Sequence, residues 1–307
     1  MKGQVTKSTG SWYEVKTESG ETHNCRLRGK FKMKGMKVNN PIAVGDWVTI
    51  EEEVQGDHSA VITEIIPRDN YIIRQSTRKT AFSHIIAANI DQALLLATVT
   101  FPKTSLGFID RFLVSAESFR IPSLVVFNKK DILEDAGIAY CHEIMKMYQD
   151  LGYSSLLISV LEDDGLEALR AILKDKTTLI AGHSGVGKST LLNALVSGLD
   201  LKTGDVSTYA NKGTHTTTFA QMFEIDETSK LIDTPGIKEL GLVDMDPSEI
   251  SHYFPEMRAY LGECKFNNCL HTNEPGCQVQ TAFDEGKIEA SRYHSYLSIL
   301  EDYDSHR

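Results

Sequence analysis

A short stretch in the second half of the chain combines the residue types that hold nucleotide phosphates. It follows the pattern G-x-x-x-x-G-K-S and lies between a β-branched run, 177–181, and a segment rich in helix formers, 191–195. Glycines let successive backbone N–H groups turn toward phosphate oxygens, the lysine supplies charge to the β- and γ-phosphates, and the serine hydroxyl ligates Mg²⁺. We therefore predict a phosphate-binding loop made of Gly182, His183, Ser184, Gly185, Val186, Gly187, Lys188, Ser189 and Thr190.

A second motif has the chemistry to select a base. The apolar run 123–127 ends at Asn128, Lys129, Lys130 and Asp131, matching N-K-x-D. A carboxylate at Asp131 can accept both the N1–H and the exocyclic amine of guanine, and adenine offers no such pair of donors. Asn128 would brace the base and the phosphate loop, and the stem of Lys129 would cover one face of the ring. We expect these four residues to line a guanine site.

Two further segments could complete the site. The run 230–232 ends at Asp233 and leads to Gly236, giving D-x-x-G; the aspartate would hold Mg²⁺ through water and the Gly236 N–H would meet the γ-phosphate. Ser159, at the end of the run 155–159, has two interpretations. Its backbone N–H could contact the guanine oxygen, or it could cap a helix.

Alternating strands and helices must position these motifs. The pattern predicts strands at 92–99, 123–127, 155–159 and 177–181, and helices at 107–119, 131–151 and 166–173. Such alternation is typical of a mostly parallel sheet with helices on both faces, in which ligands bind at the carboxyl ends of the strands. All the proposed nucleotide residues fall at such ends.

The first 75 residues have a different pattern. Five short β-rich runs, at 4–6, 11–15, 22–27, 46–50 and 60–66, predict a small closed barrel of the oligonucleotide-binding (OB) type. Residues 1–40 hold nine Lys and Arg against three Glu, and the segment 26–37 alternates basic with apolar residues. This segment could follow a phosphate backbone or be a solvated face, and the barrel could instead dock protein.

The C-terminal region contains a cluster of metal-binding residue types. Three thiols and one imidazole within fourteen residues suit a closed, tetrahedral and therefore structural zinc site. We expect a small helical domain that depends on this metal, with residues 281–300 forming a single amphipathic helix. The predicted ligands are Cys264, Cys269, His271 and Cys277.

Composition limits the class of protein. The 307 residues are 41% hydrophobic and 24% charged, with a net charge of −10, which argues against indiscriminate coating of nucleic acid. No run of 18 apolar residues occurs, and Met1 is not followed by the apolar core of a signal peptide. Five cysteines suit a reducing compartment. We expect a cytoplasmic protein, monomeric, without membrane or DNA as a partner.

The order of the motifs is unusual, because N-K-x-D precedes the phosphate loop. In this respect the chain resembles the circularly permuted GTPases. With a barrel before and a Cys/His cluster after, it resembles over its whole length the small ribosomal subunit biogenesis GTPases known as RsgA or YjeQ. The resemblance implies a multidomain α/β protein: an OB barrel at 1–75, a linker at 76–84, a circularly permuted P-loop GTPase domain at 85–245 and a zinc-binding helical domain at 246–307. It also implies Mg²⁺-dependent hydrolysis of GTP to GDP that the small ribosomal subunit stimulates, and a role in late maturation of that subunit. The small subunit and its rRNA are then the expected partners.

The water-positioning group differs from the Ras-like pattern. Ile237 follows D-x-x-G where Ras-like enzymes carry glutamine, and isoleucine cannot orient water. The resemblance suggests His215, in the polar segment 203–218, for this task, although a solvent-facing loop histidine is the alternative. We expect Thr217 to be the Mg²⁺-binding switch threonine, with Thr216 and Thr218 left open. His183 stands where the family often has glutamine.

Two other functions remain compatible with the sequence. A nucleotide-gated RNA-binding adaptor with negligible turnover would fit Ile237. A P-loop ATPase or kinase unrelated to ribosomes is disfavoured by Asn128 and Asp131. Because only about 28 residues separate Gly236 from Cys264, we also expect nucleotide state to act on the orientation of the zinc-binding domain.

Overall fold

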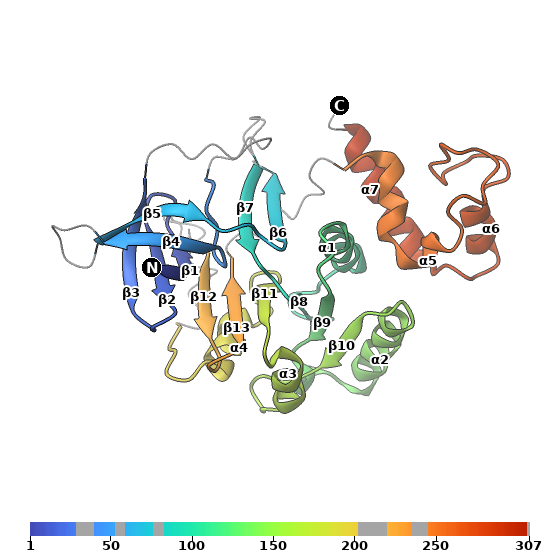
Figure 1. Cartoon of the computed structure of the whole chain (residues 1–307). Helices are drawn as coiled ribbons and strands as arrows, with labels where there is room; N and C mark the ends of the chain where they lie inside the picture. Colours follow the sequence, from blue (N-terminus) through green and yellow to red (C-terminus); the bar gives the residue numbers. More distant parts are fainter. Residues whose placement is uncertain (29–39, 53–58, 76–82, 202–219, 235–244, 306–307) are drawn as a thin grey trace.

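The structure is a computed structural model that describes residues 1–28, 40–52, 59–75, 83–201, 220–234 and 245–305. Within these ranges the chain forms an N-terminal barrel, a central α/β domain and a helical C-terminal domain (Figure 1). The predicted fold class is confirmed in all three parts.

The barrel closes through five short strands. β1 pairs with both β2 and β4, and β3 joins β5 in parallel, so the strand order β1-β2-β3-β5-β4 returns to β1. Alternate residues point inward, and Val5, Val15, Ile50 and Ile62 are fully buried in its core. This closed five-stranded arrangement is the predicted OB-like barrel. Its strands are β1 (Lys2–Ser8), β2 (Tyr13–Thr17), β3 (Thr22–Leu27), β4 (Trp47–Glu52) and β5 (Ser59–Ile65).

A hairpin follows the barrel and lies outside it. β6 (Tyr71–Gln75) pairs with β7 (Ser83–Ala88) in a separate two-stranded sheet. The segment 71–75, which the sequence pattern groups with the barrel, therefore pairs elsewhere, and Ser83 and His84 of the expected linker belong to a strand. The guanidinium of Arg68 ties this region to the barrel, because it binds both carboxylate oxygens of the buried Asp46, each at 2.6 Å.

The central domain is built on a six-stranded sheet in the order β10-β9-β8-β11-β13-β12. All neighbours are parallel except β12, which runs antiparallel to β13. The strand that enters the phosphate loop, β11, is thus central, between the strands of the other motifs. The strands are β8 (Gln92–Ala97), β9 (Ser123–Phe127), β10 (Ser154–Leu157), β11 (Thr177–Ala181), β12 (Gln221–Glu224) and β13 (Lys230–Asp233).

Helices cover both faces of this sheet. On one face Leu95 and Val125 pack with Phe112 of α1 and Tyr148 of α2. On the other face alternate residues of the same strands pack with leucines of α3 and α4. Both cores are buried, so each strand presents apolar side chains on two faces, as the continuous apolar runs predicted. The helices are α1 (Leu106–Ser118), α2 (Asp135–Asp150), α3 (Leu166–Leu173) and α4 (Lys188–Leu195).

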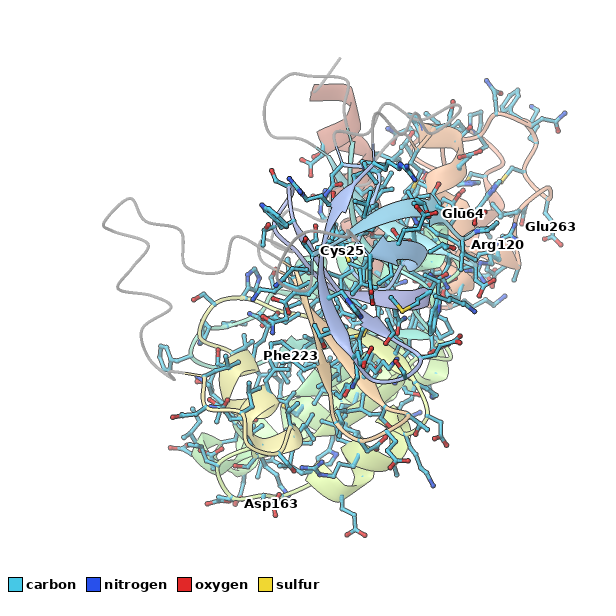
Figure 2. All side chains as sticks on the ribbon, turned by 60° about the vertical axis from the view of Figure 1, so that its left-hand side comes forward. Cys25, Glu64, Arg120, Asp163, Phe223 and Glu263 are labelled. Atoms are coloured by element: carbon cyan, nitrogen blue, oxygen red, sulfur yellow. The ribbon has the colours of Figure 1, made fainter. Side chains whose placement is uncertain are left out.

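The barrel and the central sheet are continuous. β1 pairs with the edge strand β12 at Lys7 and Gln221, and the Lys16 ammonium lies 2.6 Å from the Glu224 carboxylate. Lys230 of β13 also donates to the side chain of Gln4 at 2.7 Å. Figure 2 shows this relation, with Cys25 marking the barrel and Phe223 marking β12 below it. The barrel therefore protects the edge of the central sheet.

The C-terminal domain contains a 3₁₀ segment, η4 (Pro247–Tyr253), and three helices, α5 (Pro255–Arg258), α6 (Gln278–Asp284) and α7 (Ala290–Ser305). Our prediction of a single helix over 281–300 is wrong. Gly286 adopts a φ of 70°, and Lys287 N–H returns to the Ala282 carbonyl, which ends α6 in a left-handed turn. The chain then restarts as α7.

Candidate nucleotide and metal sites

The phosphate loop joins β11 to α4, as predicted. Gly182, Gly185 and Gly187 all have positive φ angles, of 147°, 85° and 103°. A Cβ at Gly187 would lie 2.5 Å from the Asn128 amide, and one at Gly182 would lie 2.4 Å from a backbone oxygen. Glycine is therefore required at both ends of the loop by conformation and by close packing.

Lys188 lies across this loop. Its ammonium donates to the carbonyls of Gly182 at 2.6 Å and His183 at 2.8 Å. The loop thus holds a positive charge within the ring of backbone that the glycines shape. Because α4 begins at Lys188, its N-terminal N–H groups lie at the same place, and the combination favours an anion.

Asn128 connects three loops. It follows β9 and is buried; its amide donates to the Val186 carbonyl at 2.9 Å, and its side-chain oxygen accepts the Val160 N–H at 3.2 Å. The phosphate loop, the N-K-x-D turn and the loop after β10 therefore share one side chain. The brace between base site and phosphate loop that the motif predicts matches this geometry.

The other residues of N-K-x-D are held individually. Lys129 has a left-handed backbone, φ 70°, and its ammonium donates to the Phe101 carbonyl at 2.6 Å. Lys130 forms an exposed ion pair with Asp164 at 2.6 Å. Asp131 lies in a 3₁₀ turn, η1 (Lys130–Ile132). Contacts with neighbouring loops thus fix the positions of both lysine ammonium groups. Asp131 comes directly after these lysines in the sequence.

Ser159 contributes differently from either interpretation of the sequence. Its hydroxyl donates to Asp131 Oδ1 at 2.6 Å and accepts the Glu162 N–H at 3.3 Å. Its backbone N–H donates to the Asp164 carbonyl at 3.0 Å, so this group is already engaged within the loop. The serine therefore positions the carboxylate of Asp131, and the helix that follows is preceded by Gly165 rather than capped by Ser159.

Asp233 ends β13, which pairs with β11 so that Asp233 lies opposite Ile180. Burial raises the pKa of its carboxyl group, against the lowering effects of the Lys188 charge and the Thr234 N–H. The nearby positive groups therefore do not fully offset the cost of burying a negative charge at Asp233, and a divalent cation would stabilise that charge. His215, Thr216, Thr217, Thr218, Gly236 and Ile237 lie outside the described residues.

The four predicted metal ligands come together. One donor atom from each of Cys264, Cys269, His271 and Cys277 lies within 4.8 Å of the others. His271 Nδ1 is 3.4 Å from the Cys277 sulfur and 3.6 Å from that of Cys264, and these sulfurs are 4.0 Å apart. With Zn–S near 2.3 Å and Zn–N near 2.0 Å, the ligand atoms around a tetrahedral zinc ion lie about this far from one another. The set therefore fits zinc.

The electrostatics of the cluster agree with this fit. Burial lowers the pKa of His271, with a smaller opposing effect of Glu274, so the imidazole is neutral and has a lone pair to give. Burial also raises the pKa of Cys269 to about 12, which means that its thiolate needs a positive partner. Gln278 and Gln280 direct their backbone N–H groups at the sulfurs of Cys264 and Cys277, both at 3.4 Å.

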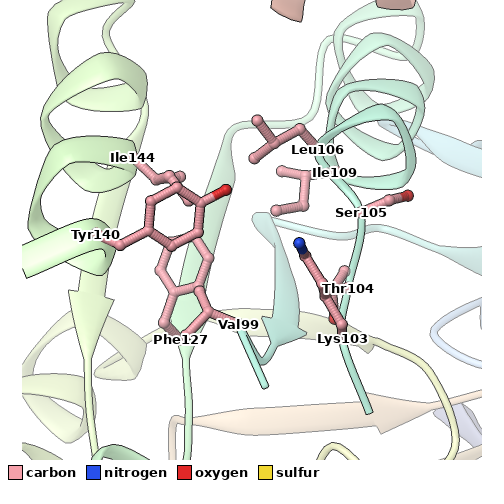
Figure 3. A pocket seen from close by; sticks show the side chains of 9 residues that line it. All are labelled: Val99, Lys103, Thr104, Ser105, Leu106, Ile109, Phe127, Tyr140 and Ile144. Atoms are coloured by element: carbon pink, nitrogen blue, oxygen red, sulfur yellow. The ribbon is translucent and has the colours of Figure 1, made fainter. Parts of the chain in front are cut away.

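A cavity of about 240 Å³ lies between α1 and α2 (Figure 3). Val99, Phe127 and Ile144 form its apolar wall, and Lys103 and Tyr140 extend toward it. None of the residues assigned to the phosphate loop lines it, so it is separate from the nucleotide site. Leu106 and Ile109 of the first turns of α1 also border it.

A central phosphate-loop strand, a guanine-type N-K-x-D turn bound to that loop, and a barrel paired to the sheet edge define the class: a P-loop GTPase whose motifs are circularly permuted. The RsgA GTPase family model matches residues 65–243, and the RsgA N-terminal domain model matches residues 2–62. The chain belongs to the RsgA GTPase family.

Individual relatives of the chain support its membership of this family. The small ribosomal subunit biogenesis GTPase RsgA of Cytophaga hutchinsonii is 52% identical over 307 residues and covers all of both chains. The protein of that name from Bacteroides fragilis is 50% identical over 98% of this chain and 97% of its own. Among solved structures, YjeQ from Thermotoga maritima has a TM-score of 0.77 at 35% identity, covering 98% of this chain and 97% of that one. YloQ, described as a circularly permuted GTPase, gives 0.73 at 28%, covering 100% and 96%.

Several residues around the site carried no recognisable signal in the sequence. Phe108 of α1 stacks on His183 with ring centroids 3.9 Å apart, and Phe101 supplies the carbonyl that holds Lys129. Leu161 follows the Ser159 turn and is 77% exposed, which leaves an apolar side chain beside the base-binding loops. Only the meeting of loops in space distinguishes these residues from ordinary apolar ones. Among the described residues no helix is long and apolar enough to cross a membrane.

Proposed function

We propose that this protein hydrolyses GTP in the biogenesis of the small ribosomal subunit, in its late maturation, and that the subunit stimulates turnover. The observation that carries the proposal is Asn128, whose side chain joins the N-K-x-D turn to the phosphate loop in a chain that belongs to the RsgA GTPase family. Asp131 of the same turn can accept the two donors of guanine, and adenine offers no such pair. The unrelated ATPase or kinase is therefore set aside.

The chain's own residues divide the work. Asp131, held by Ser159, would accept the two guanine donors, while Lys129 and Leu161 would flank the ring with their apolar atoms. Lys188 and the N–H groups of residues 182–190 would bind the phosphates. Mg²⁺, when bound through Ser189, Thr217 and Asp233, would neutralise charge between the β- and γ-phosphates.

Hydrolysis needs a group that orients water. We assign this task to His215, because Ile237 has no polar atom with which to do it. Gly236 would sense the γ-phosphate through its N–H. The adaptor without turnover remains the competing function, and Ile237 is the residue that favours it.

The barrel supplies the surface for rRNA. Trp12 is 44% exposed, and the Arg26 guanidinium lies over its ring at 5.1 Å, which gives a stacking platform next to the basic segment that begins at Arg26. One structural Zn²⁺ at the Cys₃His cluster would order the C-terminal domain. We further propose a cytoplasmic monomer that uses neither DNA nor a membrane.

Phosphate release from GTP, measured with small subunits, with large subunits and without ribosomes, tests the proposal. We expect multiple turnovers that rise only with small subunits. A protein that binds GTP and small subunits but releases no more than one phosphate per chain would be the adaptor. Displacement of labelled GTP by ATP as readily as by GTP would contradict the guanine assignment.

A further inference from the structure

Helix α1 reaches the nucleotide site at its N-terminal end. Phe108, in its first turn, stacks on His183 of the phosphate loop, with centroids 3.9 Å apart and the rings inclined by 33°. The segment just before the helix is also engaged: the Phe101 carbonyl accepts the Lys129 ammonium, and a Cβ built on Gly185 would lie 3.4 Å from Pro102. The first turn of α1 therefore contacts the phosphate loop, and the segment that leads into the helix contacts both that loop and the N-K-x-D turn.

The same helix binds the C-terminal domain. Asp110, two residues after Phe108, is fully buried; its carboxylate accepts Arg292 Nη1 at 2.7 Å and the Ser295 hydroxyl at 2.5 Å, both from α7. Arg292 is equally buried and binds Glu256 of α5 at 2.7 Å through its Nε. A buried pair of this kind holds its partners in one arrangement, because either charge left alone in the interior would be costly.

Helix α7 in turn holds the metal cluster. Tyr293 donates to the carbonyl of His271 and Tyr296 to that of Leu270, each at 2.6 Å. Ring stacking of Tyr293 on Phe283, at 4.4 Å, connects α6 to the same face. The residues of α7 that bind α1 therefore alternate with those that bind the metal loop, so this helix cannot shift without moving both.

The first turns of α1 have room to move. Leu106 and Ile109 border the cavity between α1 and α2, which holds about 240 Å³ (Figure 3). Close-packed interiors resist displacement, since a shift forces neighbouring side chains out of van der Waals contact. At the N-terminal end of α1 the resistance to displacement is reduced on the side that faces the cavity.

We propose that α1 couples the phosphate loop to the C-terminal domain, with Phe108 and Asp110 as its two positioning residues. This inference rests on the proposed GTPase function and specifies its regulation. A change of nucleotide that moves the phosphate loop is passed through Phe108 to α1 and through Asp110 to α7. This route is distinct from the covalent connection between Gly236 and Cys264.

Coupling of this kind is reciprocal. If nucleotide changes the docking of α7, then weakening that docking changes the preference of the protein for GTP over GDP, by up to the same factor. Couplings between two sites commonly amount to about 5- to 150-fold. The full chain, with its metal, can be tested in both directions.

The first experiment measures how the bound nucleotide affects the C-terminal domain. Backbone hydrogen exchange in α7 is compared with GDP and with a non-hydrolysable GTP analogue bound, in the wild type and in Phe108→Ala. We expect α7 of the wild type to exchange at different rates with the two nucleotides, and at least half of that difference, on a logarithmic scale, to disappear in Phe108→Ala. Arg111→Ala is the matched control, because it breaks an exposed ion pair with Asp302 on the same two helices and should leave the difference unchanged.

The second experiment reads the nucleotide site. Titration with fluorescent GDP and with the fluorescent analogue gives the ratio of their affinities. Asp110→Asn should shift this ratio about 5-fold or more, and the double variant with Phe108→Ala should shift it no further, since both changes cut one connection. If Asp110→Asn does not retain zinc and a cooperative melt, Ser295→Ala removes a single hydrogen bond to the same carboxylate and takes its place.

The outcomes are separable. An α7 exchange rate that is the same with both nucleotides, or a difference that survives Phe108→Ala, overturns the inference, as does a strictly additive effect of the two substitutions on the ratio. Failure of the wild type to bind GTP, or to be stimulated by small subunits, would overturn the proposed function instead. Those assays measure binding and turnover and do not depend on α1.

Discussion

Individual side chains carry the selectivity of the nucleotide site, and Asp131 is the simplest to test. We propose that its carboxylate pairs with both guanine donors, and the Ser159 hydroxyl donates to it at 2.6 Å. In Asp131→Asn the amide donates where the carboxylate accepted, so GTP affinity should fall on the order of 10- to 100-fold and xanthine nucleotides should gain. Competition between GTP and XTP in a binding titration measures this.

A control lies beside the same turn. Asp164→Asn breaks the exposed pair with Lys130 and should leave the preference between guanine and xanthine as it is. An unchanged preference in Asp131→Asn itself would remove the base-recognition role.

Asp233 offers a test that depends on pH. Burial raises the pKa of its carboxyl group above the usual 3.8, so the folded state disfavours the charge. That cost is full above the raised pKa, decreases as the pH falls from the raised pKa toward 3.8, and is absent below 3.8. In the absence of nucleotide and metal, Asp233→Asn should therefore raise the melting temperature at pH 7 and have little effect on it near pH 3. The same substitution should weaken Mg²⁺-dependent binding of GTP. A variant that melts earlier than the wild type at pH 7 would contradict this assignment.

We propose that His215 orients the attacking water and so acts in the transition state of hydrolysis. His215→Ala should slow hydrolysis about 10²- to 10⁴-fold and leave the affinity for a non-hydrolysable GTP analogue nearly unchanged, because a water-positioning group acts after binding. Single-turnover hydrolysis and analogue titration separate the two quantities. Equal losses in both would identify a switch residue that orders the binding site instead.

At the scale of elements, we expect a zinc ion at the Cys₃His cluster to determine whether the C-terminal helices form. Its ligands lie in loops, and the core above them is completed by Phe254, Tyr293 and Tyr296. Cys269→Ser should lose the zinc and unfold this region, whereas GTP should still bind because the six-stranded sheet has its own two cores. Elemental analysis and far-UV circular dichroism are the measurements. Retention of one zinc per chain would show that the ligand set is wrong.

At the scale of the whole molecule, we propose that a chain with a net charge of −10 binds the RNA of the small ribosomal subunit. Its basic residues are concentrated in the barrel, so attachment should depend on that end. Neutralising four of them should weaken small-subunit binding and reduce the log-log salt dependence by roughly 0.7 for each phosphate group no longer neutralised, up to about 3, with basal hydrolysis unaffected. The four are Arg28, Lys30, Lys32 and Lys34.

A second variant controls for charge alone. It neutralises four exposed basic residues of the central domain and should retain the affinity and the salt dependence of the wild type. If the barrel variant behaves in the same way as this control, the RNA-binding surface must lie on the C-terminal domain. The control residues are Lys103, Arg120, Lys146 and Lys174.

The sequence by itself determined the chemistry of the site and the class of fold. A phosphate loop needs glycines at set positions, and a metal cluster needs its donors close in the chain, so both requirements are met within a few residues and can be recognised there. Short β-rich runs likewise predicted the barrel, and continuous apolar runs that alternate with helical segments predicted the parallel sheet, because a strand buried on both faces is apolar throughout. The predicted residues that the structure describes meet at the carboxyl edge of that sheet or in the metal loop.

Tertiary structure alone decided how these units are joined. Nothing near Phe108 or Asp110 in the sequence indicates that one stacks on the phosphate loop and the other binds Arg292, 182 residues away. The pairing of β1 with β12 was equally invisible. These interactions depend on which surfaces meet after folding, and an isolated apolar or charged residue has the same local pattern whether it packs within its own domain or against another.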